Sequence, residues 1–355
     1  MIRFATIGTS AIVDRFLEAA ALCEGLVHTA VFSRKKETAK AFAKKHGAEF
    51  IYTDLKELAE SSDIDAVYIA SPNSCHCEQA VEMLKHGKHV LCEKPAASNA
   101  AELQRMRAAA ENGQAVLLEA MRSVYDPGFQ AIEANLYRLG KIRSVSFRFC
   151  QYSSRYDNFR KGIIENAFRP ELSNGALMDI GVYCVHPLVR LFGMPEKIEG
   201  ASVFLENGVD GMGTILAQYP GWQAVLQYSK ITSGYTESEV QGENGSMQID
   251  RIADTRKITI HERTGRRDVI LIPKEENNMV YEIREWLRLI ENSQEDEKSK
   301  IYEEASGNEM QGKRWESGFR QMFLRIAPCE KRVRQKQRTL FASQIQTRNE
   351  SVCIC

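Results

Sequence analysis

IRFATIGTSAIV, residues 2–13, joins a short apolar run to the start of a helical pattern through a glycine. Apolar residues recur at helical spacing over residues 12–23, and a second strand-like run follows. The first 120 residues repeat this alternation, with strand-like runs at residues 2–7, 27–32, 66–70, 89–92 and 115–119 and helical patterns at residues 37–46, 77–86 and 100–112. Strands separated by helices of this length predict parallel pairing through right-handed crossovers, which is the doubly wound Rossmann arrangement of α/β proteins.

The pattern changes after residue 122. Helical patterns at residues 129–139 and 176–192 flank a strand-like run and a long polar stretch, and seven period-two segments then lie between residues 202 and 272. These segments predict a largely antiparallel open sheet in an α+β carboxyl-terminal domain. The predicted organisation is a Rossmann domain at residues 1–122, a second domain at residues 123–292, and an atypical polar and basic tail at residues 293–355.

The composition excludes several classes of partner. The 355 residues carry a formal net charge of +0, so no overall field favours nucleic acid or an acidic membrane surface. No run approaches the roughly 20 apolar residues of a membrane span, and the first residues lack a signal-peptide pattern, so we expect a cytoplasmic location. Nine cysteines in so long a chain favour reduced, packed thiols. Cys75-His76-Cys77 is too closely spaced to share one tetrahedral ion, and no metal site is predicted.

The turn after the first predicted strand has the position of a phosphate-binding turn. In this fold the backbone N–H groups of that turn and the positive end of the following helix bind the pyrophosphate of a dinucleotide. Only the first of the three usual glycine positions is a glycine here, so a plain strand-to-helix turn is the alternative. The location at the start of a βαβ unit favours cofactor binding by the following residues: Gly8, Thr9, Ser10, Ala11 and Ile12.

The end of the second predicted strand indicates which dinucleotide is bound. An NAD site usually has an acidic residue there, whereas this chain has Ser33-Arg34-Lys35-Lys36. Ser33 can donate a hydrogen bond, and the guanidinium of Arg34 can pair with a 2′-phosphate. The pattern therefore predicts NADP, with NAD less favoured; a solvated basic helix start is the alternative.

Three further motifs follow in order: IASPNSCHCEQA at residues 69–80, LCEKPAAS at residues 91–98 and NGALMDIGVYCVHPLVRLFG at residues 174–193. Together with the amino-terminal turn they resemble the Gfo/Idh/MocA family of sugar and polyol oxidoreductases, over roughly residues 2–292. The segment Asp-Ile-Gly-Val-Tyr is most similar to the branch of dihydrodiol dehydrogenases, NADP-linked xylose dehydrogenases and anhydrofructose reductases. The resemblance implies an NADP(H)-dependent oxidoreductase that acts on a hydroxyl or carbonyl carbon of a sugar, polyol or diol.

The resemblance also implies that Lys94 lies beside the nicotinamide, commonly with a cis Lys-Pro peptide, and that Asp179 and Tyr183 face it from a helix. The residues agree, because positions four apart share a helix face, and His186 follows three positions later. Hydride transfer at a carbinol carbon needs a group that gives or takes the hydroxyl proton. We predict Tyr183 as that group, Lys94 as its electrostatic partner and hydroxyl anchor, and Asp179 as the orienting residue. A core tyrosine and a helix-capping aspartate are the alternatives.

Neighbouring residues have predicted binding roles. The resemblance implies that five residues border the cofactor near the nicotinamide ribose: Ser71, Pro72, Asn73, His76 and Glu93. A His76 that only opens a helix and a Glu93 that only flanks the turn are the alternatives. Three more are predicted to contact a polyhydroxy substrate: Arg122, Arg169 and His186. For the two arginines, salt-bridged surface positions are the alternative.

Two other functions stay open. Some members of the family retain NAD and cleave glycosides without net redox change, which the basic Ser33-Arg34 pattern disfavours. A dinucleotide-binding protein without turnover is disfavoured by the intact set of Lys94, Asp179 and Tyr183. The resemblance and the open sheet predict a homodimer or a higher homo-oligomer. The tail lacks the arginine-rich helix that family members usually carry.

Overall fold

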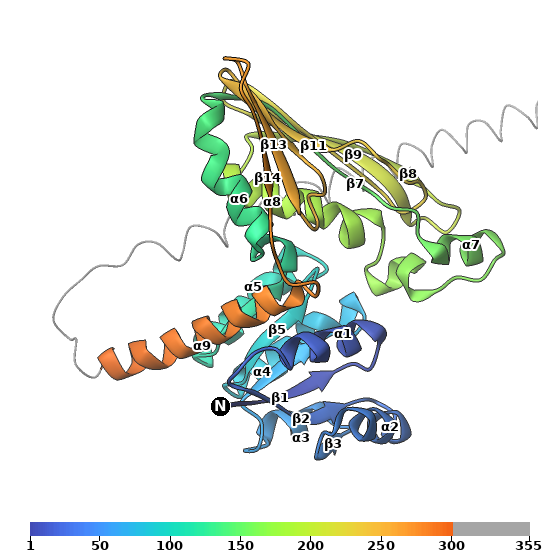
Figure 1. Cartoon of the computed structure of the whole chain (residues 1–355). Coiled ribbons are helices and arrows are strands. Elements are labelled where there is room, and N and C mark those ends of the chain that lie inside the picture. Colours follow the sequence, from blue (N-terminus) through green and yellow to red (C-terminus); the bar gives the residue numbers. More distant parts are fainter. Residues whose placement is uncertain (301–355) are drawn as a thin grey trace, which may run out of the picture.

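The computed structural model describes the backbone of residues 1–300 and the side chains of residues 1–293. Two sheets, one above the other in Figure 1, form the centres of two domains. The first sheet has six strands in the order β3-β2-β1-β4-β5-β6, and all of its pairs are parallel. Its strands are β1 (Ile2–Ile7), β2 (Leu26–Phe32), β3 (Phe50–Tyr52), β4 (Ala66–Ile69), β5 (His89–Glu93) and β6 (Leu117–Ala120). The predicted doubly wound sheet is confirmed.

Helices cover both faces of the first sheet, because alternate residues of its strands are buried on opposite sides. Phe4 and Tyr68 pack in one core with Phe16, and the rings of Phe16 and Tyr68 stack with their centroids 3.6 Å apart. Ala5 and Val67 belong to the core of the other face. On the first face lie α1 (Ala11–Ala20) and α2 (Lys36–His46), and on the second lie α3 (Leu55–Glu60), α4 (His76–Lys85) and α5 (Ala100–Asn112).

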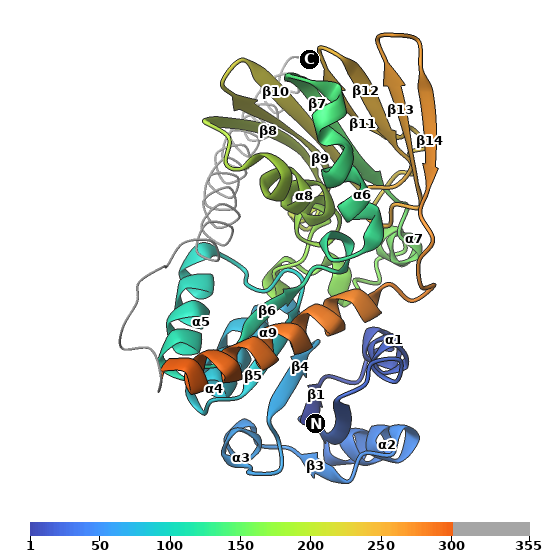
Figure 2. The same cartoon turned by 60° about the vertical axis from the view of Figure 1, so that its left-hand side comes forward.

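The second sheet has eight strands in the order β14-β13-β12-β11-β7-β10-β9-β8. Its pairs are antiparallel except for β7 and β10, which are parallel, so the predicted, largely antiparallel sheet is confirmed. Figure 2 shows α6 (Pro127–Asn135) and α8 (Val182–Phe192) against one face. The strands are β7 (Ile142–Cys150), β8 (Lys197–Phe204), β9 (Asp210–Tyr219), β10 (Trp222–Ser229), β11 (Ser238–Gly242), β12 (Gly245–Ile249), β13 (Lys257–Glu262) and β14 (Arg267–Leu271).

The chain enters α8 through a π-helical turn, Leu177–Gly181. Gly181 permits a close approach to β10, because a Cβ atom there would lie 3.0 Å from the Tyr228 ring. Such turns are frequent at functional sites, and this one contains Asp179. Within residues 1–300, Pro170–Phe192 is the segment long and apolar enough to cross a bilayer, but 61% of its apolar window is buried inside the protein, as in a core helix.

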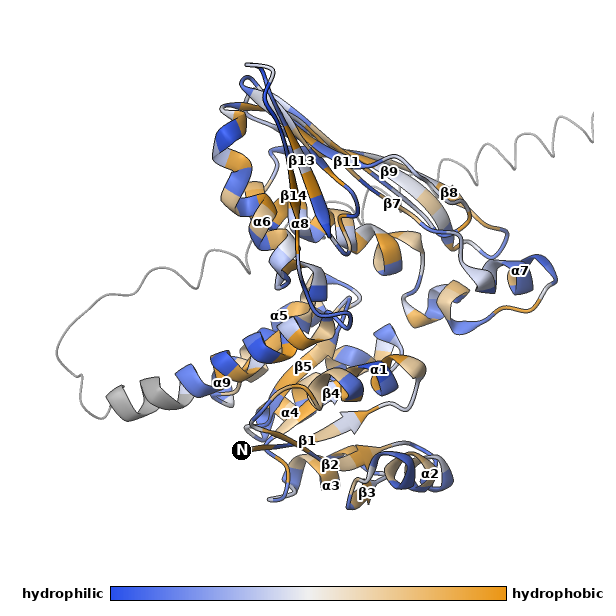
Figure 3. Cartoon of the chain, viewed as in Figure 1, coloured by the Kyte–Doolittle hydropathy of each residue, from blue (hydrophilic) through white to orange (hydrophobic). Residues whose placement is uncertain are grey.

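After β14 the chain returns to the first sheet as α9 (Met279–Lys300). Val280, Ile283 and Trp286 are buried in the same core as Phe4 and Phe16. Figure 2 shows α9 lying across the first domain, and Figure 3 shows hydrophilic and hydrophobic residues alternating along it. The sequence grouped residues 123–292 as the second domain, whereas these contacts attach α9 to the first. Of the predicted tail, residues 293–300 continue α9, and the rest lies outside the described residues.

Candidate active site

Lys94 follows the last residue of β5, at the carboxyl edge of the parallel sheet where ligands of this fold bind. The Lys94–Pro95 peptide is cis, as the resemblance implies. The ammonium donates to the Asp179 side chain over 2.7 Å and to the Asp179 carbonyl over 3.0 Å. Burial opposes the charged form, but the phenol of Tyr183 and the carboxylate of Asp179 raise the pKa of Lys94 above its ordinary value. Lys94 is therefore a fixed cation at the edge of the sheet.

Asp179 is shared between two lysines. Its Oδ1 atom pairs with Lys94, and its Oδ2 atom lies 2.8 Å from the Nζ atom of Lys230. Lys230 is 2% exposed and also donates to the Ala167 carbonyl over 2.9 Å. Although burial favours the protonated carboxyl, the two ammonium groups lower the pKa of Asp179 below its ordinary value. The cluster therefore has one negative and two positive charges.

Tyr183 lies between two cations that come from different segments. The Nζ atom of Lys94 is 5.1 Å from the centre of its ring, and the guanidinium carbon of Arg122 is 5.5 Å from it. The ring of Phe149 packs edge-on with a centroid distance of 5.5 Å. Tyr183 thus places a phenol, a group that can exchange a proton with a bound oxygen, in contact with two cations.

Glu93 uses both carboxylate oxygens within the protein. One accepts a hydrogen bond from the Tyr68 hydroxyl over 2.6 Å, and the other accepts from the Lys94 backbone N–H over 3.1 Å. These bonds fix the strand end that carries Lys94. Contact with a ribose, which the resemblance implies for Glu93, would be made in addition to them.

His76 joins two loops at the same edge. Its Nε2 atom lies 2.9 Å from the Ser71 carbonyl and its Nδ1 atom 3.0 Å from the Pro95 carbonyl, and the side chain is fully buried. Burial lowers the pKa of His76. The residue therefore supports the loop of residues 71–73 and the turn after Lys94. In that loop the Asn73 amide donates to the Ser173 carbonyl over 3.0 Å and to the Asn174 side chain over 3.2 Å, which links the loop to the second domain.

The predicted phosphate-binding turn lies between β1 and α1. Gly8 has a φ of 125°, and a Cβ atom there would lie 2.7 Å from the Ala70 carbonyl oxygen, so the turn requires glycine. Ser10 is the N-cap of α1 and makes no side-chain capping bond. Val13, which replaces a small fingerprint residue, is fully buried in the core beside Phe16. The backbone at Thr9, Ala11 and Ile12 thus opens the helix where a pyrophosphate binds in this fold.

Ser33 and Arg34 follow β2 directly and lie next to that turn, because the Gly8 N–H donates to the Phe32 carbonyl over 3.4 Å. Arg34 is exposed, and Ser33 is half-buried. An exposed guanidinium and a hydroxyl at this strand end fit a phosphate on the adenosine ribose.

The other two predicted substrate residues, Arg169 and His186, contact groups other than Lys94. Arg169 is exposed in the loop before the π-helical turn, where its Nε atom donates to the Ile164 carbonyl over 3.2 Å. The Nε2 atom of His186 is 3.9 Å from Glu119, and burial, with a contribution from Arg190, lowers the pKa of His186 to about 3. A substrate role of Arg169 or His186 stays a prediction, whereas Arg122 contacts the Tyr183 ring.

The sequence analysis assigned no role to two residues of the site, Lys230 and Glu119. Lys230 follows a period-two segment, but its pairing with Asp179 depends on the approach of β10 to the π-helical turn. Glu119 accepts from the Ala96 N–H over 2.9 Å and holds the turn after Lys94. Burial, together with Glu93, raises the pKa of Glu119 to about 7. An acidic residue ending an apolar strand is the signal that could have identified it. In the described part of the chain, no group of three His, Cys, Asp or Glu side chains is arranged to hold a metal ion.

Family models match both domains. Residues 2–120 match an oxidoreductase family with an NAD-binding Rossmann fold, and residues 134–248 match the GFO/IDH/MocA carboxyl-terminal domain. Over 300 residues the chain is 50% identical to the scyllo-inositol 2-dehydrogenase (NADP(+)) IolU of Bacillus subtilis, which covers 84% of this chain and 92% of that protein. It is 33% identical to the trans-1,2-dihydrobenzene-1,2-diol dehydrogenase of Xenopus tropicalis over 62% of this chain and 66% of that protein.

Solved structures share the fold. The 3-ketoreductase KijD10 from Actinomadura kijaniata, in complex with NADP and TDP-benzene, superposes with a TM-score of 0.75 at 24% identity, over 92% of this chain and 96% of that one. The aldose-aldose oxidoreductase from Caulobacter crescentus superposes with a TM-score of 0.76 at 19% identity, over 95% of this chain and 98% of that one.

Proposed function

The chain belongs to the Gfo/Idh/MocA family of oxidoreductases, and from this premise we propose that Lys94, Asp179 and Tyr183 carry out an NADP-linked hydride transfer on a polyol. One observation supports the assignment above the others: the ammonium of Lys94 is bonded to Asp179 and lies over the Tyr183 ring, at the carboxyl edge of the parallel sheet.

In the direction of alcohol oxidation, Tyr183 takes the hydroxyl proton while the carbinol C–H bond breaks and its hydride leaves. Lys94 stabilises the phenolate that accepts this proton and then the negative charge that develops on the substrate oxygen. Asp179 fixes the ammonium, since it accepts from Lys94 over 2.7 Å. In the reverse direction the phenol returns the proton to the carbonyl oxygen.

NADP, when bound, supplies or accepts the hydride. The residues fit this cofactor: the turn at Gly8 leaves no room for a side chain, and Ser33 with the exposed Arg34 follows the neighbouring strand. We assign the pyrophosphate to the turn of residues 8–12 and the 2′-phosphate to Ser33 and Arg34. The loop of residues 71–73 and Glu93 complete the nicotinamide side.

The substrate class follows from the relatives. The Bacillus subtilis relative is named for scyllo-inositol, and the Xenopus tropicalis relative for a cyclic diol. Both compounds have a ring carbon that bears a secondary hydroxyl next to another hydroxyl. We propose such cyclic polyols and diols as the substrates, with open-chain sugars and their carbonyl forms as the next class.

The test is NADPH formation, followed by absorbance, with a panel of inositols, cyclic diols, aldoses and glycosides. The wild-type chain is expected to reduce NADP steadily with at least one cyclic polyol. Tyr183→Phe is expected to lose about a thousandfold in kcat, because a general acid–base group contributes on the order of 10²–10⁴. Tyr137→Phe, at a side chain that is 80% exposed, is the matched control and keeps the wild-type rate.

Two outcomes would contradict the proposal. Release of a sugar from a glycoside without net NADPH change would assign the glycoside-cleaving reaction instead. Binding of NADP without turnover of any panel compound would assign a cofactor-binding role. A cytoplasmic location and a homodimer or higher homo-oligomer stay predictions, and light scattering of the purified chain tests the second.

A further inference from the structure

Arg122 has two directed contacts that link the Tyr183 ring to the start of α9. Its guanidinium carbon lies 5.5 Å from the centre of the Tyr183 ring. On the other side its Nη1 atom donates to the Oδ1 atom of Asn278 over 2.7 Å. The acceptor is a neutral amide, so this bond orients the guanidinium and leaves its positive charge for the phenol. Burial opposes the charged form, but Tyr183 raises the pKa of Arg122 by its charge and by hydrogen bonding.

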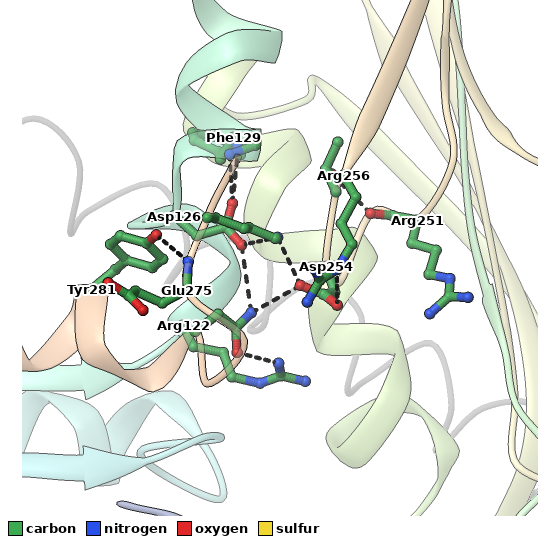
Figure 4. A network of polar contacts seen from close by, with 12 residues as sticks. Arg122, Asp126, Phe129, Arg251, Asp254, Arg256, Glu275 and Tyr281 are labelled. Atoms are coloured by element: carbon green, nitrogen blue, oxygen red, sulfur yellow. Dashed lines mark hydrogen bonds and ion pairs between the residues drawn. The ribbon is translucent and has the colours of Figure 1, made fainter. Parts of the chain in front are cut away.

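The orientation of Asn278 is fixed by a buried ionic cluster. The Asn278 amide nitrogen lies 3.2 Å from Asp254 and 3.4 Å from Asp126, so the amide oxygen faces Arg122. Both carboxylates also pair with Lys274, at 2.7 and 2.6 Å, and that lysine is completely buried. Figure 4 shows Asp126 and Asp254 at the two sides of this cluster, with Arg122 below them. An amide held by two carboxylates can present only its acceptor to the arginine.

The charged groups that face the phenol come from several elements. Lys94 comes from the end of β5, Arg122 from the short helix Arg122–Val124, and Asp179 from the turn that leads into α8. Behind Arg122 lie the carboxyl groups of Asp254 and Glu282, both of which interact with its charge. The charge of Lys94 is partly neutralised by Asp179, whereas the directly bonded partner of Arg122 is uncharged.

We infer that Arg122 is a second cation for the proton-transferring phenol of Tyr183, and that Asn278 is the residue that positions it. This inference rests on the proposed role of Tyr183. It differs from substrate anchoring by Arg122, because its effect is on the ionisation of the phenol and not on polyol affinity. Asn278 directly precedes α9, which follows both sheets in the chain. The inference therefore gives the start of α9 a part in the reaction.

The experiment compares the pH dependence of kcat/KM for NADP-linked polyol oxidation in the wild type, Arg122→Gln, Arg122→Lys and Asn278→Ala. Oxidation needs the phenolate, so the rate rises with pH. Removing one adjacent charge is expected to displace the midpoint of that rise upward by about one pH unit. Arg122→Lys retains the charge and is expected to restore most of the profile. Asn278→Ala is expected to give a smaller upward displacement.

Arg284→Gln is the matched control, since Arg284 lies on α9 with its guanidinium carbon 5.9 Å from the Tyr281 ring, outside the site. It is expected to keep the wild-type profile. A raised KM for the polyol in Arg122→Gln, with the midpoint unchanged, would overturn the inference and make Arg122 a substrate anchor. Equal thermal melting of the variants separates both results from misfolding.

A second measurement does not depend on turnover. Tyrosinate absorbance is titrated in the wild type and in Tyr183→Phe, and the difference isolates the ionisation of Tyr183. The same subtraction is made between Arg122→Gln and the double variant Arg122→Gln/Tyr183→Phe. The midpoint of this difference titration is expected at higher pH than in the wild-type background. If Arg122→Gln leaves the midpoint of the difference titration unchanged, the inference is overturned, even when the chain reduces NADP. If the midpoint moves but the wild type oxidises no polyol, only the proposed function is contradicted.

Discussion

Two lysine–carboxylate clusters lie on opposite sides of Arg122, and their compositions are reversed. At the candidate active site two lysines share one carboxylate, since Lys94 and Lys230 lie 2.7 and 2.8 Å from the oxygens of Asp179. At the start of α9 one lysine serves two carboxylates, since Lys274 lies 2.6 Å from Asp126 and 2.7 Å from Asp254. The first cluster has an excess of positive charge, whereas in the second the carboxylate of Asp254 also has the guanidinium of Arg256 at 3.6 Å.

The two clusters also differ in the exposure of their lysines. The Lys94 side chain is 14% exposed, so its surplus charge can still meet an oxygen of a ligand. The Lys274 side chain is 0% exposed, and the Asp126 carboxylate beside it accepts from further donors of the chain itself, the N–H of Gly128 and the amide of Asn278. Under the proposed function, similar ion pairs serve chemistry in one place and rigidity in the other.

Lys94→Met is expected to have the largest effect, a loss of about 10³–10⁴ in kcat/KM, because it removes both charge stabilisation and support of the proton donor. Asp179 keeps Lys230, so the fold should persist. Steady-state NADPH absorbance measures the loss, and the exposed Lys44→Met is the control. A wild-type kcat/KM in Lys94→Met would show that the cluster of Lys94, Asp179 and Lys230 does not contribute to the reaction.

Lys274→Met is expected to lower the free energy of unfolding by about 3–5 kcal/mol, since it leaves two carboxylates of a buried cluster without their cation. Urea unfolding followed by circular dichroism measures it. Lys257→Met is the matched control. Its partner Glu237 lies at 3.1 Å, but the two side chains are 40% and 35% exposed, so about 0–1 kcal/mol is expected. Equal losses of unfolding free energy in Lys274→Met and Lys257→Met would show that the burial of an ion pair does not determine its contribution to stability.

Asp179→Asn tests the site cluster by pH. The two lysines lower the pKa of Asp179 in the folded state, so its carboxylate stabilises the fold above the unfolded value near pH 4, and this contribution is lost as the pH falls through the lower folded value. At pH 7 the variant is expected to be about 2 kcal/mol less stable than the wild type, less than for a fully buried pair. The gap should narrow below about pH 4. A gap that is constant with pH would exclude the ionic explanation, and Asp63→Asn at an exposed pair is the control.

Arg34→Gln removes an exposed cation that belongs to neither cluster, and so compares the two clusters with a solvent-facing charge. The variant is expected to raise the KM for NADP about tenfold and to leave that for NAD nearly unchanged, because one charge-assisted bond to phosphate is lost. Coenzyme titration at a fixed polyol concentration measures the ratio. Lys36→Gln, at the first residue of α2, is the control, and an equal effect there would favour a general basic field over a specific contact.

Most of the fold follows from local sequence patterns. The five longer strands of the first sheet and all eight strands of the second coincide with strand-like segments of the sequence, although β8 begins at Lys197, several residues before its predicted segment. The strand β3, Phe50–Tyr52, was missed because three residues are too few to show a period. The parallel pairing of β7 with β10 was missed as well, because hairpin signals describe only neighbours in sequence.

The candidate site was predictable where its geometry is local. Asp179 and Tyr183 are four residues apart, so helix periodicity alone predicted a shared face. Lys230, directly after β10, pairs with Asp179 across a separation of 51 residues, and Arg122 meets Asn278 across a separation of 156 residues. Contacts of this kind depend on how the two sheets are placed, which no local pattern encodes. The substrate role predicted for His186 stays a prediction, and its Nε2 atom lies 3.9 Å from Glu119, a neighbour that helix position alone does not indicate.

The return of α9 to the first sheet also sets an order of assembly. A ribosome that has translated residue 120 has made all six strands of the first domain, but not the helix that supplies Trp286 and Ile290 to the core around Phe4. That core stays incomplete until the entire second sheet has emerged from the exit tunnel. The nascent chain must therefore keep an apolar face uncovered during most of its synthesis, and a premature stop anywhere before α9 would leave this face as a target for chaperones or proteases.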